Sequence, residues 1–172
     1  AIEPLTATAA LADGRLQLWI ATQLPGLACA AAANAIGLDP DKVIVHPMLV
    51  GGSFGRKYEV EIAAQVAILA HKIKRPVQLV WSRAEDMMHE PFRPAARARM
   101  AARLGRAGHI DAWQARIAAP NALGEMRSRT LGGLSADEAR RKHAGEPHAH
   151  AVDGAIPPYA IEAFGIDHHA AD

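Results

Sequence analysis

Cysteine is almost absent from this sequence, in which Cys29 stands alone among 172 residues. A single cysteine forms no internal disulfide, and it cannot by itself build a zinc or iron–sulfur site. Cys29 lies among alanines in "GLACAAAANAIG", a setting that is typical of a buried, unreactive thiol. The cysteine count leaves the cellular compartment open.

Long apolar runs and an excess of one charge are missing as well. No hydrophobic stretch approaches the ~18 residues that a membrane-spanning helix needs. The 19 basic and 18 acidic side chains give a formal net charge of +1, whereas a nucleic-acid-binding protein concentrates basic residues on one face. We therefore expect no transmembrane segment and no nucleic-acid partner.

The two ends of the sequence lack the usual features of protein termini. It starts "AIEPLTATAAL", without a methionine or a signal-like segment, and it stops at "GIDHHAAD", without a helix cap or a closing strand. We expect a fragment of a longer polypeptide, in which partners of any site here lie outside these residues.

The first half of the chain alternates between strand and helix patterns. Strands are predicted at residues 6–11 and 15–22, around an Asp-Gly turn typical of hairpins. Pro25 opens an alanine-rich helix that runs to Ile36, with Gly37 placed to end it. A short buried strand at residues 43–47 follows.

A second helix is predicted to begin near Lys57, with an apolar stripe of Ile62, Val66, Leu69 and Ile73. The further predicted strands span residues 77–83, 96–104 and 109–119. Beyond Pro120 the sequence becomes polar and rich in histidine and proline, which indicates a short helix and an irregular excursion. We predict an α+β fold, a two-layer mixed sheet with packed helices, with a domain at 1–119 and a partial C-terminal extension at 120–172.

The segment "GGSFGRK", residues 51–57, joins a predicted strand to the second helix. Its glycine spacing fits neither the dinucleotide fingerprint, nor the Walker A motif, nor the kinase glycine loop. Backbone N–H groups in such a loop still favour an anion or a large polar ligand, with Arg56 and Lys57 adding positive charge. Phe54 presents its ring to a flat ligand or anchors the loop. The alternative is a tight turn whose glycines serve packing, with Phe54 in the core.

Several segments in a fixed order resemble the molybdopterin-binding large subunit of the xanthine dehydrogenase/aldehyde oxidase family. They are "EPLTATA", "DGRLQLWIATQLPG", "AIGLDPDKVIVHPMLVGGSFGRK", "QVAILAHKIKRPVQLVWSRAEDMMHEPFRP" and "PPYAI". The "FGRK" and "HEPFRP" pieces are most similar to the isoquinoline 1-oxidoreductase β-subunit branch. The resemblance covers most of residues 1–119 and implies the fold of a molybdenum cofactor-binding domain.

The resemblance also implies roles for individual residues. Gln23, in the dipeptide "TQ", takes the place of the glutamine that approaches the molybdenum. The loop that contacts the cofactor corresponds to Gly52, Ser53, Phe54 and Gly55, with Arg56 beside it. The cofactor implied is molybdopterin cytosine dinucleotide. Ser53 replaces a glycine that is common in the family, and Tyr58 stands where purine-oxidising relatives have an acidic residue.

The family's reaction is hydroxylation of a carbon next to a ring nitrogen, or of an aldehyde carbon, with water as the oxygen source. Its general base is a glutamate in a "GxGE"-type segment, and none of the glutamates here stands in that context. We therefore predict no catalytic residue in this fragment, with the base beyond Asp172. We expect no cofactor bound tightly to the fragment and no activity of the fragment alone.

Two hypotheses follow for the function. The first is part of a molybdenum hydroxylase that acts on a small-molecule substrate and passes electrons to a small subunit with 2Fe-2S clusters. The second is a cofactor-free binding or subunit-assembly module that retains the fold. No metal site is expected at the five histidines of the C-terminal stretch, which we interpret as solvated loop residues: His143, His148, His150, His168 and His169.

Overall fold

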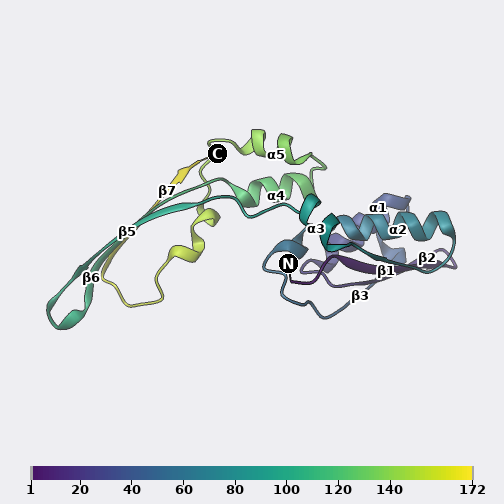
Figure 1. The fold of residues 1–172 in the computed structure, drawn as a ribbon, viewed down its shortest axis with the longest axis horizontal. Coiled ribbons are helices and arrows are strands. Elements are labelled where there is room, and N and C mark those ends of the chain that lie inside the picture. Colours follow the sequence, from purple (N-terminus) through teal and green to yellow (C-terminus); the bar gives the residue numbers. More distant parts are fainter. Residues whose placement is uncertain (1, 172) are drawn as a thin grey trace. The chain divides into compact units, whose positions relative to one another are not determined.

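The computed structural model describes residues 2–171, and these divide into two compact units (Figure 1). The first unit ends at Pro91 and the second begins at Phe92. The boundary predicted after Ala119 lies within the second unit, at the end of one of its strands.

The first unit is built on a four-stranded mixed sheet in the order β3-β2-β1-β4. Strands β1 (Thr6–Ala12) and β2 (Arg15–Ile20) form the predicted hairpin. Strand β3 (Val43–Pro47) pairs with β2 in parallel, and β4 (Val77–Val80) pairs with β1 in antiparallel. Parallel and antiparallel pairs thus occur in one sheet, and the predicted α+β class with a mixed sheet is confirmed.

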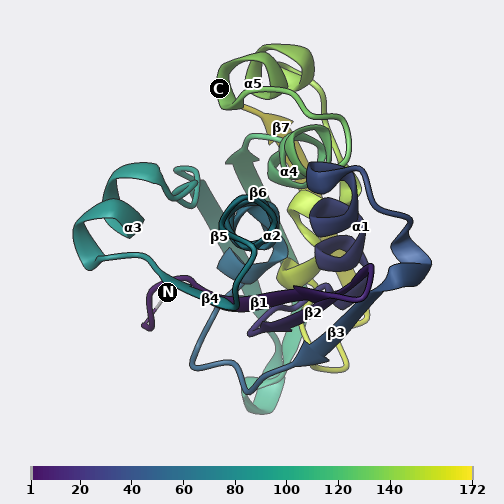
Figure 2. The same cartoon turned by 90° about the vertical axis from the view of Figure 1, so that its right-hand side faces the viewer.

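Two helices, α1 (Pro25–Ile36) and α2 (Glu61–Ile73), cover one face of this sheet (Figure 2). Alanines make the contact close, since their side chains let two helix backbones approach each other. The buried apolar residues of the two helices pack on those of the strands and form one core. From the helices the core includes Ala28, Ala32, Ala33, Ala63, Val66 and Ala67, and from β2 it includes Leu16, Leu18 and Ile20. The result is a two-layer unit with one core.

Helix α1 begins and ends where the sequence predicts. Pro25 fixes the first turn, and Gly37 follows the helix with φ 65°, a left-handed conformation that glycine adopts without strain. The N–H of Gly37 caps the carbonyls of Ala33 and Asn34. Cys29, on this helix, is half-buried rather than buried as predicted, and burial raises the pKa of its thiol above the ordinary value.

The predicted start of the second helix near Lys57 is wrong, because helix α2 begins at Glu61. A separate 3₁₀ turn, η2 (Arg56–Tyr58), precedes it, and Glu59 after that turn is extended. In the predicted stripe Ile62 and Val66 are buried, but Ile73 is 54% exposed because it is the last residue of the helix.

The strand predicted at residues 77–83 is too long. It ends at Val80, and helix α3 (Arg83–His89) follows. The Ser82 Oγ accepts a hydrogen bond from the N–H of Glu85 at 3.1 Å, which caps the first turn of α3. This local cap ends the extended conformation.

The second unit contains a three-stranded sheet in the order β5-β6-β7. Strands β5 (Arg97–Leu104) and β6 (Ile110–Ala119) pair in antiparallel, joined by the turn η3 (Arg106–Gly108). Strand β7 (Ala163–Ala170) pairs with β6 in parallel, inside the stretch predicted to be irregular. Its sequence, "AFGIDHHA", lacks a regular apolar alternation, so only pairing with a distant strand defines it.

Helices α4 (Ala122–Thr130) and α5 (Ala136–His143) pack on each other beside this sheet. One predicted short helix is therefore two. Ser135 and Glu138 form a capping box at the start of α5. The remaining short turns are η1 (Pro40–Lys42), η4 (Ala149–Ala151) and η5 (Asp153–Ala155).

Two of the histidines interpreted as solvated are held by the fold instead. His143, at the end of α5, lies 2.9 Å from the Ser128 Oγ and 2.5 Å from the Glu146 Oε2. His168 lies 3.0 Å from the carbonyl oxygen of Ala119. Residues 2–171 contain no group of three His, Cys, Asp or Glu that holds a metal ion. They also contain no helix long and apolar enough to cross a membrane.

Candidate functional site

The loop between β3 and α2 turns through backbone conformations that favour glycine. The φ angles are 75° at Gly52, 50° at Phe54 and 93° at Gly55. A Cβ added at Gly52 would lie 3.0 Å from the Ile2 Cδ1 and 3.3 Å from the Phe54 Cε2, so the site has little room for a side chain. Phe54 holds a positive φ without being glycine, a strained state that is common at ligand sites.

The carbonyl oxygen of Lys57 joins this loop to the dipeptide Thr22–Gln23. The N–H of Gln23 donates to it at 3.1 Å, and the Thr22 Oγ1 donates to it at 3.2 Å. The same Oγ1 accepts a hydrogen bond from the N–H of Leu24 at 3.1 Å. Segments that lie more than thirty residues apart in sequence therefore meet at one backbone atom.

The side chain of Lys57 is buried, with 1% of its surface exposed, and its Nζ forms an ion pair with the Glu3 Oε1. Glu3 also accepts a hydrogen bond from the N–H of Gly51. Both contacts favour the charged carboxylate, the one with Lys57 more strongly, so they lower the pKa of Glu3 below its ordinary value of 4.5. Glu3 thus fixes the first glycine of the loop and neutralises the cation behind it.

Arg56 is buried as well, and its charge is balanced within the protein. Its Nη2 lies 2.6 Å from the Glu61 Oε1, and its Nε lies 3.6 Å from the Glu90 Oε2. This geometry corrects the expectation that Arg56 and Lys57 present free positive charge beside the loop. The first turn of α2 provides one of the counter-ions and the segment after α3 provides the other.

Two uncharged polar atoms near this junction, the Gln23 Oε1 and the Ser53 Oγ, are buried without a hydrogen-bond partner among residues 2–171. The Nε and Nη1 of Arg56 are in the same state. A buried acceptor or hydroxyl without a hydrogen bond destabilises a fold by roughly 1–3 kcal/mol. Such atoms are retained where a ligand or another chain satisfies them.

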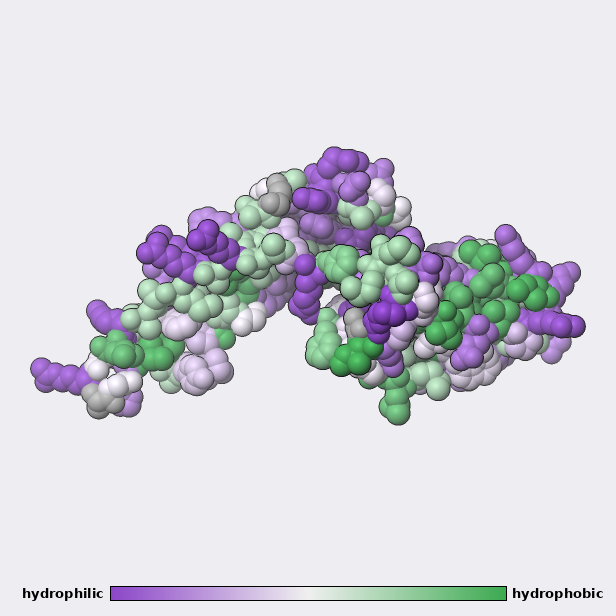
Figure 3. All heavy atoms as spheres, viewed as in Figure 1, coloured by the Kyte–Doolittle hydropathy of each residue, from purple (hydrophilic) through white to green (hydrophobic). Residues whose placement is uncertain are grey.

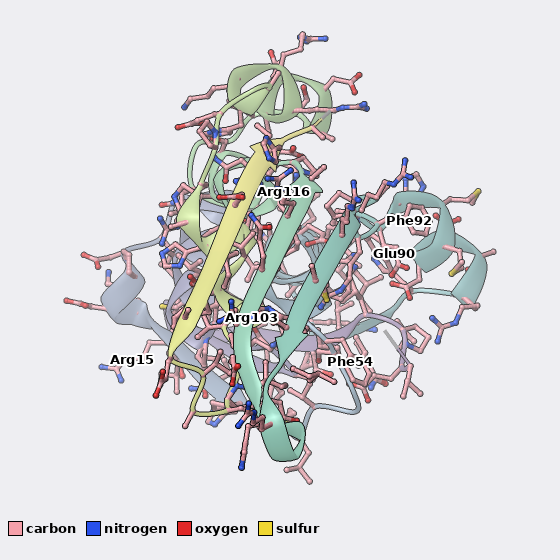
Figure 4. The ribbon with its side chains drawn as sticks, turned by 90° about the vertical axis from the view of Figure 1, so that its left-hand side faces the viewer. Arg15, Phe54, Glu90, Phe92, Arg103 and Arg116 are labelled. Atoms are coloured by element: carbon pink, nitrogen blue, oxygen red, sulfur yellow. The ribbon has the colours of Figure 1, made fainter. Side chains whose placement is uncertain are left out.

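Phe54 is 69% exposed, so it does not lie in the core (Figure 4). The alternative of a tight turn whose glycines serve packing is therefore wrong in placing Phe54 in the core. The ring stands on the outer side of a turn whose next residue, Gly55, directs the chain into η2.

The residues that hold this loop in place have no recognisable signal in the sequence. Glu3, Glu61 and Glu90 provide its counter-ions, and Thr22 provides the hydroxyl that binds the Lys57 carbonyl. These glutamates were considered only as candidates for a general base. Burial of a lysine is uncommon, and nothing in the local pattern "GRKYEVE" indicates it.

Comparison with known families identifies the chain. The model of the family described as "Molybdopterin cofactor-binding domain" matches residues 1–128, about three quarters of the sequence. The chain belongs to this family. The predicted resemblance is confirmed, and the domain described above is a molybdopterin cofactor-binding domain of the xanthine dehydrogenase/aldehyde oxidase type.

Relatives with curated names agree with this assignment. The isoquinoline 1-oxidoreductase subunit β of Brevundimonas diminuta is 38% identical over 91 residues, which cover 53% of this chain and 12% of the relative. A xanthine dehydrogenase of Emericella nidulans is 32% identical over 77 residues, 44% of this chain and 6% of the relative. The chain thus matches a small part of each relative's length.

Solved structures show the same fold. Quinoline 2-oxidoreductase from Pseudomonas putida 86 matches with a TM-score of 0.63 and 20% identity, over 98% of this chain and 20% of that protein. Aldehyde oxidoreductase from Desulfovibrio gigas matches with a TM-score of 0.54 and 24% identity, over 69% and 13% of the two chains. The molybdopterin cofactor-binding domain here therefore has the architecture found in molybdenum hydroxylases.

Proposed function

We propose that this domain contributes the cofactor-binding loop of a molybdenum hydroxylase that inserts oxygen from water into an N-heteroaromatic or aldehyde carbon. The cofactor proposed is molybdopterin cytosine dinucleotide. A small subunit with 2Fe-2S clusters is the proposed electron acceptor. The likeness to the isoquinoline 1-oxidoreductase subunit supports the N-heteroaromatic class among these substrates.

The two buried atoms without partners carry this proposal. The Gln23 Oε1 and the Ser53 Oγ are held within one hydrogen-bonded junction, yet neither has a partner among the described residues. A polar cofactor against the loop would satisfy both. The Gln23 Oε1 is an acceptor, which an N–H or O–H group of the cofactor would satisfy, whereas the Ser53 hydroxyl can donate to an anionic or oxo-bearing group.

The loop backbone would supply further contacts. Gly52 and Gly55 have positive φ angles, 75° and 93°, which take their N–H groups out of the regular helical and strand patterns. Two buried nitrogens of Arg56, Nε and Nη1, have no hydrogen-bond partner among the described residues, and of these Nε lies 3.6 Å from the Glu90 Oε2. We keep Arg56 among the proposed cofactor-binding residues because the Nη1 donor is available while its charge is balanced by Glu61.

When bound, the molybdenum cofactor supplies the activated oxygen and accepts the electrons of the reaction. The role of this chain is to bind and orient it, with Gln23 near the metal and the glycine loop along its polar groups. No residue here is proposed as the general base, which we place outside these 172 residues. The isolated chain should accordingly show no hydroxylase activity.

Replacing Gln23 by leucine should affect kcat strongly and the free energy of unfolding only weakly. Because the Gln23 Oε1 has no internal partner, the free energy of unfolding of the chain should fall by no more than about 0.5 kcal/mol, or should rise. In the full-length protein, kcat should fall by about 100-fold, because the carboxamide proposed to contact the cofactor is lost. Chemical denaturation of the chain and steady-state kinetics of the full-length protein measure the two effects.

Gln17→Leu is the matched control, because the Gln17 Oε1 does have a partner. It lies 2.6 Å from the His46 Nε2, and His46 stacks on Trp19 with ring centroids 4.9 Å apart. This variant should lose about 1 kcal/mol of stability while keeping its kcat. If Gln23→Leu destabilises the chain as much as Gln17→Leu and leaves kcat unchanged, then Gln23 is structural, and the cofactor-free assembly module becomes the better account.

A further inference from the structure

Strand β5 is an unpaired edge of the second unit's sheet. In the part of the chain that the structure describes, β6 is its only partner, and all eight of its residues are exposed. Its outer side therefore presents a row of backbone N–H and C=O groups without a strand to pair with. Edge strands of this length usually pair with another strand or carry features that prevent it.

One face of this sheet gathers arginines. Arg97, Arg99 and Arg103 lie on the same face of β5, because side chains two residues apart point the same way. Arg116 of β6 stands directly opposite Arg99 in the register, so two like charges face each other. Figure 4 labels Arg103 and Arg116 on these two strands. We call these four residues the arginine face.

Among residues 2–171, one carboxylate forms an ion pair with the arginine face. The Asp167 Oδ2 of β7 lies 3.5 Å from the Arg116 Nε, and both of these side chains are exposed. Within residues 2–171, no carboxylate lies at ion-pair distance from Arg97, Arg99 or Arg103. Like charges directly opposite each other destabilise a sheet, so anionic groups bound against the arginine face would stabilise it.

The opposite face of the sheet is apolar. The register places Met100, Trp113 and Phe164 on it, next to Ile117 and Ile166. Met100 is 55% exposed and Phe164 is 54% exposed. The surface over the β5–β6 hairpin accordingly shows hydrophobic and hydrophilic residues side by side (Figure 3).

These observations specify the strand that fits the open edge of β5. Side chains of an added strand alternate between the same two faces. Carboxylates would then neighbour Arg97, Arg99 and Arg103, while apolar side chains would continue the face of Met100. A second copy of β5 does not fit, because antiparallel pairing would set arginines beside arginines.

We propose that the outer edge of β5 binds an extended strand of another polypeptide in which carboxylate and apolar residues alternate. Backbone hydrogen bonds along the edge provide affinity, and the arginine face selects the acidic sequence. This inference does not depend on the molybdenum cofactor. It makes the second unit an assembly surface, whereas the first unit holds the cofactor loop.

A charge exchange tests the proposal with the 172-residue chain. The probe is a fluorescent peptide as long as β5 in which glutamate and valine alternate. It should bind the wild type, and the double variant Arg97→Glu and Arg99→Glu should weaken this binding by at least about tenfold. A peptide with lysine in place of glutamate should show the reverse preference. Fluorescence anisotropy gives the dissociation constants.

Two controls distinguish strand addition at the edge of β5 from non-specific electrostatic attraction between the peptide and the chain. The double variant Arg141→Glu and Lys142→Glu changes the charge of α5 by the same amount, and it should leave the affinity for the acidic peptide within about twofold. A peptide N-methylated at alternate amides should not bind, because it cannot pair with a strand edge. Equal loss in the α5 variant, undiminished binding of the methylated peptide, or tighter binding of a single-stranded oligonucleotide would overturn the proposal.

Discussion

Replacing Glu3 by glutamine should lower the free energy of unfolding of the chain by about 2 kcal/mol. The change leaves the ammonium of Lys57 buried at 1% exposure without its counter-ion. Loss of one partner from a fully buried ion pair destabilises a protein by about 3–5 kcal/mol. We expect less here because Glu3 itself is 35% exposed, so that water screens part of the interaction.

The two partners of this ion pair should not be equivalent. Lys57→Met removes the buried charge and leaves a carboxylate that is partly hydrated, so this variant should lose only about 1 kcal/mol. Glu85→Gln is the matched control, because Glu85 pairs with His89 at 3.4 Å where both side chains are more than half exposed. That variant should stay within about 0.5 kcal/mol of the wild type. Chemical denaturation at neutral pH measures all three.

Acid should remove the difference between the wild type and Glu3→Gln. The pKa of Glu3 is lowered in the folded chain, so its contribution is complete above the unfolded value near 4.5 and is lost as the pH falls through the folded value. The two denaturation curves should therefore converge on acidification. A difference that persists after Glu3 is protonated would mean that the ion pair with Lys57 is not its cause.

Replacing Gly52 by alanine should lower the molybdenum content of the full-length protein by about tenfold, which corresponds to about 1.4 kcal/mol of binding free energy. The added Cβ would meet the Ile2 Cδ1 at 3.0 Å, at a φ of 75° that alanine rarely adopts. The loop must shift to accept it, and the backbone groups proposed to face the cofactor shift with it. Inductively coupled plasma mass spectrometry of purified protein measures the metal.

Gly37→Ala provides the control for backbone strain alone. Gly37 also has a positive φ, 65°, but nothing lies within 4 Å of an added Cβ, and the residue ends α1 away from the loop. Gly37→Ala should lose about 1 kcal/mol of stability through the strained φ alone, and Gly52→Ala should lose somewhat more because of the contact with Ile2. Only Gly52→Ala should lose molybdenum. Equal metal loss in the two variants would trace the effect to general destabilisation rather than to the loop.

The sequence alone predicted the elements whose signals are local. The hairpin of β1 and β2 follows from alternation around an Asp-Gly turn, and α1 follows from a proline at its start and Gly37 after its end. Elements that depend on distant partners were missed. Strand β7 exists because β6 pairs with it. Helix α3 is different, because its Ser82 cap is a local signal that the prediction of a longer strand overlooked.

The segments that form the candidate site were predicted from the sequence, but the ion pairs that hold them in place were not. The proximity of Gln23 to the glycine loop was inferred from a family resemblance, and the structure gives its physical basis in the shared carbonyl of Lys57. The sequence could not reveal that Arg56 and Lys57 are buried, because pairing with Glu61 and Glu3 is a tertiary event. The roles proposed for Gly52, Ser53, Phe54, Gly55 and Arg56 in cofactor binding stay predictions.

The molybdenum content of the full-length protein tests the central proposal most directly. The protein would be purified from a molybdate-supplied host that makes the cofactor, and its molybdenum would be counted per polypeptide by mass spectrometry. The cofactor loop proposed here predicts about one molybdenum atom per polypeptide, with a clear decrease in Gln23→Leu and Gly52→Ala. Wild-type protein that folds and purifies normally but contains no molybdenum would contradict it.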